Sequence, residues 1–144
     1  MWRMKKIVLL LLIALSAMAV NAQSEKKPFK AYIYNNVYEV YIRMNLYDND
    51  VRVPGQELYG ELPGFLGKRN NSFCWVMAGA EITGERTATL QMVNDFGSED
   101  LTATLTCVND STYMLRQEKG STIRVPSKGK WVKLPKTIGF KRKN

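Results

Sequence analysis

From residue 29 onward, apolar side chains recur at every second position, which is the spacing of a strand with one buried face. Between Val37 and Tyr47 one alternate set of residues is apolar and the other is largely polar. Residues 87–93 and 101–107 place threonines between their apolar residues, as on a strand whose outer face meets solvent. Because no segment after residue 22 keeps a helical period, the sequence predicts an all-β fold.

Turn-forming clusters of Gly, Asn, Asp and Ser separate the alternating segments at intervals of roughly 8 to 14 residues, as in a meander of hairpins. We count eight or nine strands. Residues 53–72 are the least regular part, since they contain two prolines and four glycines. We predict one strand from Glu57 to Glu61 there, followed by a long loop, and we expect any lid or binding loop in this region.

About eight consecutive antiparallel strands must protect their edges, and closing the sheet removes the edges altogether. The pattern therefore predicts a small up-and-down β-barrel, because sequential hairpins favour that connectivity over a Greek key. A two-sheet β-sandwich is the alternative. A barrel of this size either is filled by side chains or holds one small ligand.

The first 22 residues have the three parts of a secretory signal peptide. Three basic residues precede an unbroken apolar run from Ile7 to Leu15, and Val20-Asn21-Ala22 supplies a cleavage site. We therefore predict a cleaved signal peptide at residues 1–22 and a single domain at residues 23–144. The protein is then exported to the periplasm or the outside of a Gram-negative bacterium, with no transmembrane segment in its mature chain. An uncleaved anchor is the alternative, although nine apolar residues are short for a span of about 20.

The net charge of the full chain is +8, from 21 basic and 13 acidic residues. Residues 116–144 hold ten Lys or Arg and one acid, whereas residues 23–115 hold eight basic and twelve acidic residues. A basic strip from Lys128 to Lys143 can attract anionic polymers or lipid headgroups. The alternative is an ordinary last strand with lysines on its solvent face. Export argues against nucleic acid as a partner.

The composition excludes several kinds of chemistry. The chain has no His, so it cannot form a Ser-His-Asp triad, a Cys-His pair or an imidazole metal site. We therefore expect no enzyme, no metal and no cofactor. Its two cysteines, Cys74 and Cys107, could form a disulfide in an oxidising compartment, or they could remain separate buried thiols.

Tyrosine and tryptophan are the side chains that suggest a ligand, because each combines an apolar ring with a polar group. Tyr41 and Tyr47 alternate with the apolar set and so have no core to pack in. We predict a ligand-binding role for five aromatic residues: Tyr41, Tyr47, Tyr59, Trp75 and Trp131. Packing in the core and the barrel wall is the alternative for the aromatic residues as a group.

A secreted chain of this length, built from consecutive hairpins with inward aromatic residues, resembles the lipocalin and avidin group of small barrels. The resemblance is architectural, since the first strand reads Lys30-Ala31-Tyr32-Ile33-Tyr34 and lacks the lipocalin Gly-x-Trp signature. No ligand residues can be carried over from it. The chain also resembles small exported barrels of Gram-negative bacteria.

These observations predict a non-enzymatic, exported binding protein for a small amphipathic ligand or a glycan. The alternative is a protein-interaction module of the cell envelope, such as an inhibitor or an accessory subunit. The barrel interior discriminates between a carrier and a surface role, because a filled interior leaves a ligand only the surface and the loops.

Overall fold

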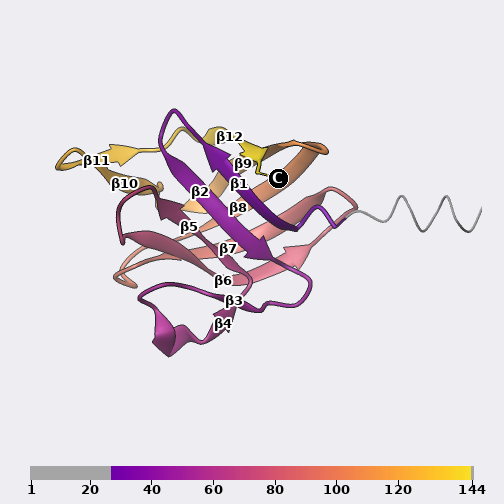
Figure 1. Cartoon of the computed structure of the whole chain (residues 1–144), viewed down its shortest axis with the longest axis horizontal. Helices are drawn as coiled ribbons and strands as arrows, with labels where there is room; N and C mark the ends of the chain where they lie inside the picture. Colours follow the sequence, from indigo (N-terminus) through magenta and orange to yellow (C-terminus); the bar gives the residue numbers. More distant parts are fainter. Residues whose placement is uncertain (1–26, 144) are drawn as a thin grey trace, which may run out of the picture.

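The computed structural model describes residues 27–143, which form an all-β domain around a closed antiparallel barrel (Figure 1). Eight strands build the barrel: β1 (Lys30–Asn35), β2 (Val40–Asn45), β5 (Gly64–Lys68), β6 (Cys74–Ile82), β7 (Thr87–Asn94), β8 (Asp100–Asn109), β9 (Thr112–Gly120) and β12 (Thr137–Arg142). Each pairs with the next, and β12 returns to β1, so the up-and-down barrel is confirmed and the sandwich is not formed. The predicted signal peptide lies outside the described residues.

Two small hairpins are inserted between barrel strands. The first consists of β3 (Val51–Arg52), the short 3-10 helix η1 (Glu57–Tyr59) and β4 (Glu61–Leu62). The second consists of β10 (Arg124–Ser127) and β11 (Lys130–Lys133), and it projects at one side of the barrel (Figure 1). Within residues 27–143, no helix has the length and apolarity needed to cross a membrane.

The predicted alternation of inward apolar residues is confirmed in three strands. Their inward residues are all buried: Val40, Ile42 and Met44 on β2, Ala88, Leu90 and Met92 on β7, and Leu101, Ala103, Leu105 and Cys107 on β8. Large side chains from other strands join the same cluster, among them Trp75, Tyr113 and Phe140. The interior is thus packed with side chains, which leaves the surface and the loops for a ligand.

Both ends of the barrel are closed by chain segments that hydrogen-bond to buried polar side chains. At one end, Tyr113 donates its hydroxyl to the Pro28 carbonyl oxygen at 2.6 Å. At the other end, the segment from 121 to 136 folds over the core. Gln117 accepts the Ile123 amide at 2.7 Å and donates to the Pro135 carbonyl at 2.9 Å, so it ties both sides of this segment to β9.

The prediction for residues 53–72 was wrong in two respects. Glu57–Tyr59 form a 3-10 helix rather than a strand, and Gly64–Lys68 form a barrel strand rather than a loop. All five residues of β5 are buried, so the strand lacks the alternation that reveals an exposed face. Two of its residues are glycines because β2 lies very close to β5 there. A Cβ at Gly64 would overlap the Arg43 carbonyl oxygen, and a Cβ at Gly67 would overlap the Tyr41 ring.

The buried phenol and thiol predict a loss of stability at alkaline pH. Burial raises the pKa of Tyr113 from 10 to about 12, and burial together with the Asp95 carboxylate raises the pKa of Cys74 from 9 to about 11. The folded state therefore holds these protons more tightly than the unfolded state, and their contribution is complete below pH 9. The urea midpoint should fall between pH 9 and 12, and Tyr113→Phe should flatten the part above pH 10. If the urea midpoint of Tyr113→Phe fell with pH above 10 as steeply as that of the unmodified protein, the loss of stability could not be assigned to the Tyr113 phenol.

Candidate functional site

A hollow of about 190 Å³ lies on the outer wall of the barrel, where β1, β2 and the end of β5 meet. Its walls include Tyr32, Glu39, Tyr41, Arg69 and Lys143, and we call it the tyrosine pocket. Aromatic faces, one carboxylate and two cations thus converge on a space smaller than a drug-sized site of roughly 300 Å³ or more. Its size suits one small polar group or a single sugar ring.

Two tyrosines form the apolar wall of the pocket. The Tyr32 and Tyr41 rings stack with centroids 5.4 Å apart and planes inclined by 12°. Tyr41 also meets the Phe65 ring edge-on, and it lies over Gly67, which is its direct partner on β5. Burial, followed by the neighbouring Tyr32, raises the pKa of Tyr41, so its phenol stays protonated at neutral pH. Tyr41 therefore contributes an uncharged ring to this wall.

The β1–β2 turn shapes the rim of the pocket. Asn35 accepts the Tyr38 amide at 2.9 Å through its Oδ1 and donates its Nδ2 to the Gly139 carbonyl at 2.8 Å, which joins the turn to β12. Glu39 has a left-handed backbone (φ 54°), and its carbonyl accepts the Arg69 amide at 2.9 Å. The turn is thus held against the end of β5, and Arg69 is brought to the pocket.

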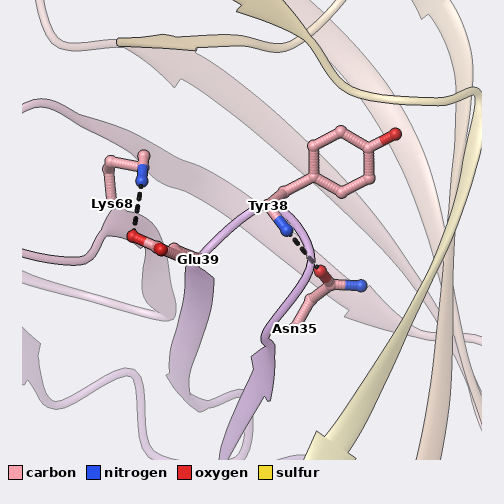
Figure 2. Close-up of polar contacts among 4 residues, drawn as sticks. All are labelled: Asn35, Tyr38, Glu39 and Lys68. Atoms are coloured by element: carbon pink, nitrogen blue, oxygen red, sulfur yellow. Dashed lines mark hydrogen bonds and ion pairs between the residues drawn. The ribbon is translucent and has the colours of Figure 1, made fainter. Parts of the chain in front are cut away.

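Glu39 does not supply a free negative charge to the pocket. Its Oε2 lies 3.3 Å from Lys68 Nζ, and Lys68 is only 6% exposed (Figure 2). An ammonium this deeply buried needs a counterion, so the carboxylate is committed to it. Figure 2 also shows the Tyr38 ring pointing away from this pair.

The two remaining cations of the pocket have no such partner. Within residues 27–143, neither Arg69 nor Lys143 forms an ion pair with a carboxylate. Lys143 Nζ lies 5.4 Å from the Tyr32 ring centroid, and Arg43 Cζ lies 6.0 Å from the same centroid. Cations near a ring face are attracted by its quadrupole, but this does not neutralise them. The pocket therefore carries a net positive potential beside an aromatic wall.

The structure does not bring the five predicted ligand residues together. Tyr41 lies in the tyrosine pocket, whereas Tyr47 accepts the Phe29 amide through its hydroxyl at 3.2 Å near the opposite end of the barrel. Tyr59 is in η1, and Trp131 is exposed on β11. Trp75 is 0% exposed and donates Nε1 to the Arg124 carbonyl at 3.1 Å, so its side chain packs as the alternative for the aromatic residues has it.

The two cysteines are free and occupy different clusters. Cys107 faces the barrel interior, and Cys74 packs with Phe65 and Val76 on the outer side of the wall. The arrangement is thus the alternative with two separate buried thiols.

The turn between β7 and β8 contains the carboxylates Asp95 and Glu99. Asn94 closes this turn, since its Oδ1 accepts the Ser98 amide at 2.9 Å. No cluster of potential metal ligands occurs in the part of the chain that the structure describes.

The sequence analysis missed Tyr32, Arg69 and Lys143 as pocket residues. They lie on three distant parts of the chain. Lys143 meets Tyr32 because β12 closes onto β1, where the Lys143 amide donates to the Tyr32 carbonyl at 2.9 Å, and Arg69 is brought in at the end of β5. Two signals were available: Tyr32 shares a strand face with Tyr34 next to a predicted turn, and Lys143 ends the basic strip that begins at Lys128.

Comparison of the chain with protein-family models, with curated proteins and with solved structures found no match. The resemblance to lipocalin and avidin barrels therefore stays a prediction, and the function has to be argued from the geometry.

Proposed function

We propose that the protein is an exported, non-enzymatic binding module that takes an acidic sugar residue of a glycan into the tyrosine pocket. The observation that carries this proposal is a pair of cations, Arg69 and Lys143, that form no ion pair within residues 27–143 and lie beside the stacked rings of Tyr32 and Tyr41. Together they offer charge for a carboxylate and an apolar face for a sugar ring.

The surroundings of the pocket support binding without chemistry. Among the described residues that line the pocket, Glu39 is the one carboxylate, and it is engaged with Lys68, while burial raises the pKa of the Tyr41 phenol. The Tyr41 phenol is therefore not poised to give up its proton to a substrate near neutral pH. The side chains offer recognition: a guanidinium can bind a carboxylate through two parallel hydrogen bonds, and the ammonium adds a point charge.

The filled interior supports a surface role over that of a carrier. Trp75 and Tyr113 lie within the barrel with 0% exposure, in the volume where a hollow barrel would hold a ligand. A ligand on the outer wall remains open to solvent on one side, which suits one residue of a longer polymer. The proposal therefore selects the glycan over an enclosed small amphipathic ligand.

The first test compares an acidic with a neutral oligosaccharide of equal length by isothermal titration calorimetry. We expect trigalacturonate to bind and maltotriose not to bind. Arg69→Gln and Lys143→Gln should each weaken trigalacturonate binding by about tenfold or more, since each removes a hydrogen bond to a charged group. Added salt should weaken binding as well.

The matched controls are Arg116→Gln and Lys119→Gln, which remove the same charges from exposed positions on β9. These variants should bind trigalacturonate as the unmodified protein does. Equal losses in both pairs of variants would mean that only overall charge matters, and tight binding of maltotriose would rule out a site for an acidic sugar.

A further inference from the structure

A second surface, distinct from the tyrosine pocket, gathers aromatic rings at the end of the barrel that carries the β10–β11 hairpin. Phe73 stands at its centre, with the Trp131 ring 5.0 Å away edge-on and the Phe96 ring 6.0 Å away. Phe96 is 73% exposed and Trp131 is 56% exposed, although both are large apolar residues. We call Phe73, Phe96 and Trp131 the aromatic end. Exposed apolar side chains that cluster in this way mark an interaction surface.

The two exposed rings come from separate loops with a space between them. Phe96 lies in the β7–β8 turn, and Trp131 lies on β11, opposite Pro126 of β10. A hollow of about 220 Å³ separates them, with Trp75 and Asn94 also contributing to its lining. An aromatic side chain from another molecule could enter this hollow and contact both rings.

Charges of opposite sign flank the aromatic end. Arg124 and Lys133 are directly paired across β10 and β11 and share a face with Trp131. Asp95 and Glu99 precede and follow Phe96 in the β7–β8 turn, and Glu99 lines the hollow together with Arg124. Within the described residues, Arg124, Lys133 and Glu99 are in no ion pair, whereas Asp95 accepts a hydrogen bond from Gln56. The aromatic end thus carries charges of both signs at its border.

A surface that carries rings, a hollow and charges of both signs can complement a copy of itself, and we propose that the aromatic end binds a second copy of this chain around a two-fold axis. An isologous contact places the same patch on both subunits. Each Phe96 would then enter the hollow of the other copy, and the acidic turn of one copy would face the basic hairpin of the other. A membrane of anionic lipid fits the surface less well, because Asp95 and Glu99 lie beside Phe96 and would be repelled.

Sedimentation velocity over a range of concentrations tests the proposal on the protein purified from cells. We expect a monomer–dimer equilibrium that shifts toward monomer in Phe96→Ser. The matched control is Val108→Ser, since Val108 is 51% exposed but lies at the other end of β8. A monomer at every concentration would overturn the proposal, as would a dimer that both variants leave unchanged.

Reversing one charge on each side of the proposed interface distinguishes this two-fold dimer from other modes of association. Glu99→Lys and Lys133→Glu should each weaken the dimer by about tenfold, because like charges then face each other twice. Mixing the two variants should restore a dimer that contains one of each, which native mass spectrometry resolves by mass. Failure of the mixture to form this mixed dimer would overturn the two-fold arrangement. Attachment of a monomeric protein to vesicles of anionic phospholipid would overturn it too.

Discussion

Trp75→Ala is expected to lower the free energy of unfolding by about 3–5 kcal/mol, the range for removing a large aromatic side chain from a core. The indole is 0% exposed and fills the barrel between the strands and the 121–136 segment. Its loss leaves a cavity that a closed barrel can collapse only partly. It also removes the donor to the Arg124 carbonyl, which holds β10 over the barrel end.

Chemical unfolding followed by circular dichroism measures this loss. Tyr59→Ala is the control, because it removes an aromatic ring from an exposed position in η1 and should change stability by roughly 0.5 kcal/mol or less. If Trp75→Ala were as mild as its control, the indole could not be filling the interior, and a carrier function would regain its support.

Gln117→Leu is expected to lower the free energy of unfolding by about 1–3 kcal/mol, the cost of leaving a buried polar group without a partner. The buried amide of Gln117 accepts from Ile123 and donates to Pro135, so it satisfies backbone groups on both sides of the β10–β11 hairpin. Leucine has a similar size but cannot bond to either. The segment that carries the hairpin then loses these two side-chain attachments to β9 and keeps the bond from the residue 117 amide to the Lys136 carbonyl.

Hydrogen exchange shows where this loss occurs. Amides between residues 121 and 136 should exchange faster in Gln117→Leu, while those of β7 and β8 should change little. Gln91→Leu is the control, since Gln91 lies on the exposed face of β7. The tyrosine pocket is built from other strands, so binding of trigalacturonate should persist in Gln117→Leu. Uniformly faster exchange would contradict a local role for Gln117.

The architecture of the barrel could be predicted from the sequence because most of its strands have one solvent-exposed face and one buried face. The alternation on β2, β7 and β8 follows directly from that asymmetry. β5 was missed because both of its faces are covered: Leu66 packs inward, and Phe65 packs under the first inserted hairpin. Its glycines, which resemble loop residues in the sequence, are required by the close packing of β2.

Most residues of the candidate site could not be predicted from the sequence, for a different reason. Tyr41 was found because it alternates with the apolar set, but Lys143 and Tyr32 meet only at the seam where β12 pairs with β1. No local pattern encodes that closure. For Trp75 the sequence does not show the direction of the side chain, because an aromatic residue in a barrel strand can face inward or outward. When the indole is buried, one backbone carbonyl is enough to accept the hydrogen bond of its N–H.

Mapping of ¹H–¹⁵N chemical shifts during a titration with trigalacturonate tests the central claim most directly. The account predicts that the amides which shift belong to the tyrosine pocket, above all Tyr32, Tyr41, Arg69 and Lys143. Amides flanking the inward residues of β7 and β8 should stay in place. Shifts centred on those interior positions, or no shift at any position, would contradict a glycan site on the outer wall of the barrel.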